Sequence, residues 1–148
     1  MSTVAKLTPV KTDQEEAFFK WDSSRLGLGV EPMDAEHQKL IQLMNQLYSL
    51  SESKAPRGRV EMVLDQLASY TVKHFEAEER YMKSIGFPEL VTHQQIHKSL
   101  LEKFTAHAKA FKESKDNAPS SEFFTFLKIW LQAHIAGVDR KYAHHSKK

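Results

Sequence analysis

Apolar residues recur at intervals of three and four along most of this chain, which is the spacing of one face of a helix. Four stretches show the pattern, and they predict helices over residues 34–52, 59–85, 89–114 and 120–143. The links between them are short and contain breaking residues, such as Gly86 and Pro88. Four long helices with short links predict an all-α fold, an antiparallel up-down-up-down four-helix bundle.

The two ends of the chain do not share this pattern. Residues 1–33 lack a sustained helical period, and we expect an irregular N-terminal arm that packs on the bundle. Residues 34–143 would form the bundle itself. Residues 144–148 contain two histidines and two lysines and are expected to form a basic tail.

Several positions on the apolar faces carry polar side chains instead. His74 and Glu78 lie four residues apart on the inward face of the helix predicted over 59–85. A buried carboxylate without a partner is costly, whereas one that binds a metal or a cation is tolerated. The inward polar residues are His37, His74, Glu78, His93, His97, His134 and Asp139. Each predicted helix contributes at least one, and a bundle core can bring them to one point, so the pattern predicts a shared metal site.

Composition narrows the classes of protein that fit. The 148 residues are 41% hydrophobic, which is ample for one domain with a real core. A net charge of +2 gives no electrostatic case for nucleic acid or for a membrane surface. The chain has no cysteine, so thiolate metal sites and disulfides are excluded. Neither a signal peptide nor an apolar span is visible, and we expect a cytoplasmic protein.

The donor types indicate which metals would fit. Imidazole and carboxylate suit iron, zinc, copper or nickel. Seven ligands are too many for one tetrahedral zinc, so two metal ions are needed. Two octahedral ions offer about twelve positions, of which five histidines, two bridging carboxylates and one bridging oxygen fill all but one. A site with one vacancy is suited to binding one small ligand.

Four motifs make the chain resemble the bacterial branch of the hemerythrin family. They are Asp34-Ala-Glu-His37, His74-Phe75-x-x-Glu78-Glu79, His93-x-x-x-His97 and Trp130-Leu131-x-x-His134-Ile135-x-x-x-Asp139. Met33, where isoleucine is more usual, is a minor departure. The resemblance implies a four-helix bundle with a non-haem di-iron site, bridged by an oxo or hydroxo group, that binds dioxygen reversibly.

The resemblance also implies roles for individual residues. His93, His97 and His134 resemble the ligands of the filled iron, and His37 and His74 resemble those of the iron with the vacancy. Glu78 and Asp139 resemble the bridging carboxylates. By the same resemblance, we expect the walls of the oxygen pocket to be Leu40, Trp130, Leu131 and Ile135.

Two classes of function remain open at this point: an oxygen carrier for storage, delivery or sensing, and a di-iron oxidase or peroxidase. An iron-handling protein is a weaker third. Oxidase sites in bundles are rich in carboxylates, whereas five of the seven donors here are neutral histidines, so we expect a carrier and not an enzyme. We expect a monomer, and an oxygen-consuming protein is the class of partner that a carrier would serve.

Other polar residues have simpler interpretations. His107 lies about 15 Å along the helix from His97 and is expected on its flank. His144 and His145 are interpreted as solvated, and Glu79 as an acid at the surface or behind a ligand. His134 and Asp139 lie five residues apart, about 140° around a regular helix, so both can face one metal pair only if the helix widens or bends between Ile135 and Asp139.

Overall fold

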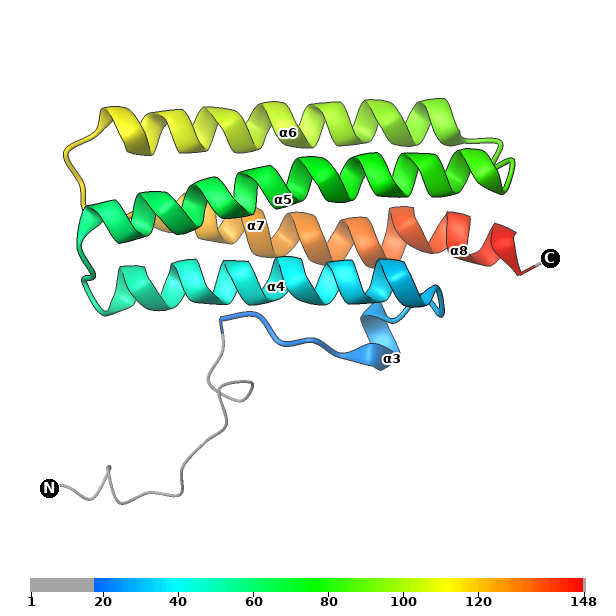
Figure 1. The fold of residues 1–148 in the computed structure, drawn as a ribbon, viewed down its shortest axis with the longest axis horizontal. Helices are drawn as coiled ribbons and strands as arrows, with labels where there is room; N and C mark the ends of the chain where they lie inside the picture. Colours follow the sequence, from blue (N-terminus) through cyan, green and yellow to red (C-terminus); the bar gives the residue numbers. More distant parts are fainter. Residues whose placement is uncertain (1–17, 148) are drawn as a thin grey trace, which may run out of the picture.

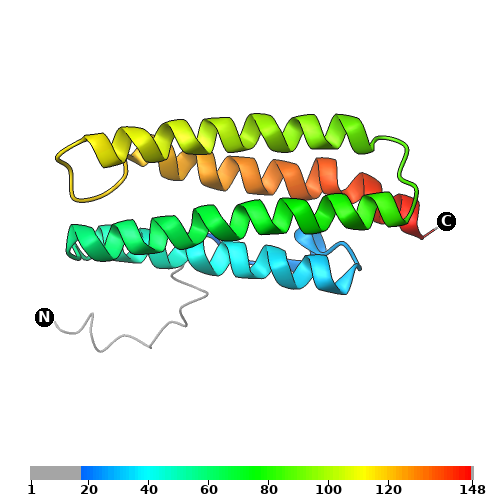
Figure 2. The same cartoon turned by 45° about the horizontal axis from the view of Figure 1, so that its top comes forward.

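The structure is a computed structural model that describes residues 18–147. Its main elements are the helices α4 (Glu31–Glu52), α5 (Arg57–Ser84) and α6 (Leu90–Glu113) and the continuous run of α7 (Ser121–Ala133), η1 (His134–Asp139) and α8 (Arg140–Ser146). Figures 1 and 2 show these four rods side by side, alternating in direction, with short links at the ends. The predicted all-α four-helix bundle is confirmed.

Local chemistry explains where the helices begin and end. Pro32 lies in the first turn of α4, where its missing N–H costs nothing, and Glu31 and Asp34 place negative charge at the positive end of the helix. The helix therefore begins at Glu31, three residues before the predicted start at residue 34. Past the end of α5, Gly86 has a φ of 65°, a left-handed conformation that glycine adopts without strain.

The part of the predicted arm that the structure describes packs on the bundle, whereas residues 1–17 lie outside the described residues. The backbone N–H of Phe19 donates to Asn45 Oδ1, and Asn45 Nδ2 donates back to the Phe19 carbonyl, both at 2.8 Å. Leu26 and Leu28 are buried. Within this mostly irregular arm, residues Ser23–Leu26 form a short helix, α3, which the Asp22 side chain caps.

The last rod contains the predicted irregularity. Residues His134–Asp139 form a π-helix, η1, between α7 and α8. A π turn contains one extra residue, so Asp139 takes the position that the fourth residue after His134 would occupy in a regular helix. Helical structure then continues to Ser146, three residues into the segment predicted as a basic tail.

The bundle core has two halves of different character. In the distal half, near the links at residues 53–56 and 114–120, the buried side chains are apolar, among them Leu47, Leu64, Phe104 and Phe123. The other half, called the ligand half below, contains the seven predicted ligands. No helix among residues 18–147 is long and apolar enough to cross a membrane.

Arg57 closes the distal end of the bundle. Its two terminal nitrogens donate to four carbonyl oxygens at 2.7–3.0 Å, those of Phe111, Lys112, Ser114 and Asp116. The guanidinium also lies over the Phe111 ring, 4.6 Å from its centroid. Because these carbonyls lie at and beyond the C-terminal end of α6, Arg57 satisfies acceptors that have no partner within that helix.

Candidate metal centre

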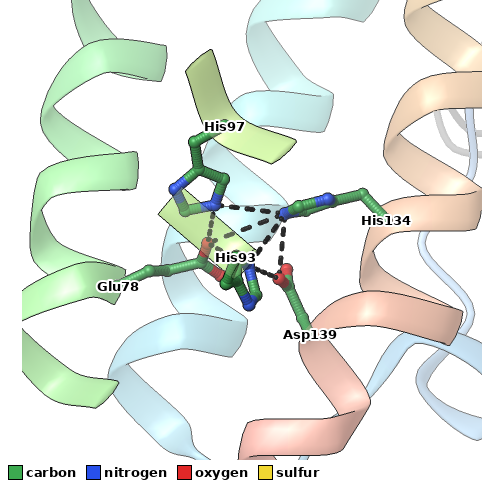
Figure 3. Close-up of side chains that lie close together, drawn as sticks. All are labelled: Glu78, His93, His97, His134 and Asp139. Atoms are coloured by element: carbon green, nitrogen blue, oxygen red, sulfur yellow. Dashed lines mark hydrogen bonds and ion pairs between the residues drawn. The ribbon is translucent and has the colours of Figure 1, made fainter. Parts of the chain in front are cut away.

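The bundle brings all seven predicted ligands together inside the ligand half. None of these side chains is more than 3% exposed. Helix α4 contributes His37, α5 contributes His74 and Glu78, α6 contributes His93 and His97, and η1 contributes His134 and Asp139. Figure 3 shows five of them, which point toward one another from three of the four rods.

The ligands form two overlapping groups. In each group, one donor atom from every residue lies within 4.8 Å of the others. The first, the three-histidine group, consists of Glu78, His93, His97, His134 and Asp139; the second, the two-histidine group, consists of His37, His74, Glu78 and Asp139. The two carboxylates are common to both groups, as expected of residues that bridge two cations.

The individual oxygens show how each carboxylate is shared. Glu78 Oε1 lies 3.0 Å from His97 Nε2, while Glu78 Oε2 lies 3.1 Å from His37 Nε2 and 3.3 Å from His74 Nε2. Asp139 Oδ1 lies 2.9 Å from His134 Nε2, and Asp139 Oδ2 lies 3.1 Å from His37 Nε2. Each carboxylate therefore presents one oxygen to each group.

Unpaired polar atoms show that the donor set fits cations. Three imidazole nitrogens face one another, with His134 Nε2 at 3.3 Å from His93 Nε2 and 3.2 Å from His97 Nε2. Among residues 18–147, neither oxygen of Asp139, nor His74 Nε2, has a hydrogen-bond partner of good geometry. Buried polar atoms are rarely left this way. Imidazole nitrogens and carboxylate oxygens that converge in a dry core are the donors that iron and related metals take.

Protonated histidines balance the acids in the metal-free chain. Burial alone would lower the pKa of His74, but the charge of Glu78 and the contact with Glu36 raise it to about 10. Burial would raise the pKa of Glu78, yet the charge of His74 and the contact with His37 hold it well below its usual range. Since a histidine must be neutral to bind a metal, cations would compete with these protons.

Two partly exposed acids hold ligand rings from behind. His74 Nδ1 hydrogen-bonds with Glu36 Oε1 at 2.7 Å, and His97 Nδ1 hydrogen-bonds with Glu79 Oε2 at 2.8 Å. These contacts direct the opposite nitrogen, Nε2, toward the centre. Glu79 thus lies behind a ligand, one of its two predicted places. The sequence interpretation missed Glu36, although it lies inside the first motif, next to His37.

Two aromatic residues complete the site, and the sequence interpretation assigned a role to neither. The Tyr142 hydroxyl donates to Glu78 Oε2 at 2.8 Å. This contact joins α8 to α5, and no spacing within either helix indicates it. The Phe75 ring stacks on His97 with centroids 3.8 Å apart and planes 5° from parallel.

The four predicted wall residues, Leu40, Trp130, Leu131 and Ile135, are all buried. Trp130 meets the Phe75 ring edge-on at 5.9 Å, so Phe75 lies between Trp130 and the His97 ring. The indole N–H of Trp130 is buried without a hydrogen-bond partner. That these side chains wall an oxygen pocket stays a prediction.

The remaining histidines lie outside both groups. His107 stacks between Phe123 and Phe126 in the distal half, with centroids 5.5 and 5.2 Å away. His144 is exposed, as expected. His145 also lies in neither group, but it is only partly solvated, because its Nε2 lies 3.2 Å from the Ile85 carbonyl and its ring packs on Phe87.

Comparisons with known proteins agree with this geometry. Residues 28–144 match the family described as "Hemerythrin HHE cation binding domain". A bacteriohemerythrin of Stenotrophomonas maltophilia is 30% identical over 127 residues, which cover 86% of this chain and 80% of that protein. A hemerythrin-like protein of Naegleria gruberi is 32% identical over 124 residues, covering 84% and 90%. The crystal structure of a wild-type hemerythrin superposes with a TM-score of 0.80 at 25% identity, covering 89% of this chain and all of that one.

Proposed function

Since this chain belongs to the hemerythrin family, we propose that it binds dioxygen reversibly at two iron ions and acts as a carrier for storage, delivery or sensing. The observation that carries the proposal is the pair of overlapping ligand groups. Three histidines serve one group and two serve the other, while Glu78 and Asp139 serve both. That inequality leaves room for a small ligand on the two-histidine side.

Each side chain has a role in this proposal. His93, His97 and His134 would hold the fully coordinated iron, His37 and His74 the other, and Glu78 and Asp139 would bridge them. When bound, the two irons would supply the two electrons that dioxygen takes up and would recover them when dioxygen leaves. Leu40, Leu131 and Ile135 are at most 1% exposed, and Trp130 is 6% exposed. We infer that they keep water and protons from the bound ligand.

The position of the acids favours a carrier over an enzyme. Glu36 and Glu79 contact the Nδ1 atoms of His74 and His97, on the far side of the rings from the converging Nε2 atoms. They are therefore poorly placed to deliver a proton to a bound ligand. The Tyr142 hydroxyl is closer, but it is buried and its hydrogen bond, at 2.8 Å, is directed to Glu78 Oε2. Cleavage of an O–O bond by general acid catalysis would need a freer proton donor.

The decisive experiment records visible spectra of the iron-loaded protein under argon, then air, then argon again, together with oxygen uptake. We expect two irons per chain, uptake of one dioxygen per pair, and a visible band that disappears when oxygen is removed. Zinc-loaded protein is the control and should show no band. Catalytic consumption of a reductant far faster than autoxidation would establish an oxidase or peroxidase instead. Iron uptake well beyond two ions per chain would establish an iron-handling protein.

A further inference from the structure

The hydroxyl of Tyr142 lies inside the ligand cluster. Its side chain is 0% exposed, and its oxygen is 2.8 Å from Glu78 Oε2. Three rings fix its position: His93 at 5.8 Å, Tyr81 at 5.6 Å and Phe87 at 6.5 Å between centroids. The hydroxyl is therefore held in place by packing.

The π turn brings Tyr142 to this position. In a regular helix, residue 142 would be rotated about 80° from the face of His134. With one extra residue in η1, Asp139 and Tyr142 take the places of the fourth and seventh residues after His134, which share its face. The same irregularity thus directs both a bridging carboxylate and a hydroxyl into the centre.

The hydroxyl acts on only one oxygen of Glu78. Oε2 accepts the Tyr142 hydrogen bond and faces His37 and His74, the two-histidine group. Oε1 faces His97 at 3.0 Å in the three-histidine group. Asp139 has no hydrogen bond of good geometry at either oxygen within the part of the chain that the structure describes. Tyr142 therefore makes the two ends of the Glu78 bridge unequal.

We propose that Tyr142 is a positioning residue that weakens Glu78 Oε2 as a metal ligand and so makes the two-histidine group the weaker of the two metal positions. The inference rests on the proposed function only in requiring that two metal ions bind. A hydrogen bond to a full negative charge is stronger than one to a charge that a cation already shares. Loss of the hydroxyl should therefore harm the metal-free protein more than the loaded one.

The test is Tyr142→Phe, with Tyr81→Phe as the matched control. The control removes a hydroxyl from the same ring cluster, but from a ring that has no contact with Glu78 among the described interactions. Zinc is titrated into each metal-free protein by calorimetry, and the thermal midpoint of the metal-free form is measured separately.

We expect Tyr142→Phe to tighten the weaker zinc position by about three- to tenfold and to leave the tighter one within about twofold. The midpoint of the metal-free protein should fall by about 5 °C. A residue that only supports the fold would weaken both positions, so weaker or unchanged binding at the second position would overturn the inference. Equal tightening of both positions would also overturn it. If wild-type protein takes up fewer than two zinc ions, the two-metal premise itself fails.

A measurement on the wild-type protein covers the case in which Tyr142→Phe does not fold. The buried hydroxyl proton of Tyr142 should give a downfield resonance in the proton NMR spectrum of the metal-free protein. We expect this resonance to move upfield with the second zinc equivalent and not with the first. Movement with the first equivalent alone would overturn the inference.

Discussion

The distal half and the ligand half of the bundle use the same four rods, yet they bury opposite kinds of side chain. Around Leu47, Leu64 and Phe123 the core is apolar, and each buried side chain contributes about 1.5–3 kcal/mol through removal from water. Around Glu78 and Asp139 the core is polar, and burial of these groups costs free energy unless a bound cation compensates for the lost hydration. The comparison indicates that the apolar distal half stabilises the fold. The polar ligand half depends on that stability to keep its side chains in place.

Replacing a ligand with an apolar residue should test most clearly whether the ligand half serves metal binding and not the stability of the fold. His134→Leu should lower the metal content from two ions per chain to one or none, because the three-histidine group loses a donor. The metal-free protein should lose about 1–3 kcal/mol, because the change removes a buried imidazole with an unpartnered Nδ1 but also takes away the 2.9 Å contact of its Nε2 with Asp139 Oδ1. Metal analysis and denaturant unfolding with chelator measure the two effects. A loss of several kcal/mol without metal would show that the ligand half also carries the fold.

The converse change lies in the distal half. Phe123→Ala should destabilise the metal-free protein by about 3–5 kcal/mol, because Phe123 is 1% exposed and its removal leaves a cavity. The folded variant should still bind two metal ions. Ile129→Ala is the control, because Ile129 is 61% exposed and its loss should change stability by less than about 0.5 kcal/mol. Metal loss in folded Phe123→Ala protein would contradict the separation of the halves.

The stability of the metal-free protein and that of the metal-loaded protein should depend differently on pH. The contact of His74 with Glu78 raises the pKa of His74, so its stabilisation is complete below the ordinary histidine value of 6.5 and is lost as pH rises through about 10. The same contact lowers the pKa of Glu78. The contribution of the ionised Glu78 carboxylate to stability is therefore lost as pH falls below 4.5. The metal-free protein should be most stable between about pH 4.5 and 6.5. Metal binding needs neutral histidines and should strengthen above that range.

Thermal midpoints measured against pH, with and without chelator, would show the difference. The two curves should diverge as pH rises from 6 to 8. Parallel curves would mean that the histidines carry no protons that metal must displace.

The smallest expected effect is a change in oxygen release and autoxidation rates, and it is measured by making the same substitution, leucine to alanine, in each half. Leu131→Ala and Leu47→Ala should cost similar stability, about 2–5 kcal/mol, because Leu131 is 1% and Leu47 is 0% exposed. Only Leu131→Ala should speed oxygen release and autoxidation, by about severalfold, if Leu131 walls the oxygen pocket. Stopped-flow release and the decay of the oxygenated band measure both rates. Equal rates in the two variants would place Leu131 in the packing core alone.

Much of the site could be predicted from sequence because its information is local. Spacing of four placed His74 with Glu78 and His93 with His97, and the awkward spacing of five between His134 and Asp139 predicted the irregularity found in η1. The contact of Glu36 with His74 could not be predicted in this way. It joins two helices, and it depends on their relative rotation and depth, which no spacing within either helix specifies.

The ends of the helices were predicted less well than the ligands, because they depend on contacts outside the helix itself. The first helix begins at Glu31, and its Asp34 side chain accepts hydrogen bonds from the backbone of Leu28 and Gly29. The last helix continues to Ser146 while His145 packs on Phe87, in the link between α5 and α6. The first extension depends on contacts with the arm only five and six residues away. The second depends on a contact with a distant segment that appears only once the bundle has formed.

The extra residue in η1 has a consequence for how the length of this chain can change. The links at residues 53–56 and 114–120 lie at the surface, where insertions and deletions are generally tolerated. Between His134 and Asp139, loss of one residue would restore a regular helix with the aspartate still on the face of His134, but gain of one residue would turn everything up to Ser146 by about 100°. Asp139 and Tyr142 would then leave the centre together, although neither had been replaced. In this segment an added residue would therefore disrupt the centre as a replaced ligand does, even beside Ala136 and Gly137, which are exposed and contribute no ligand.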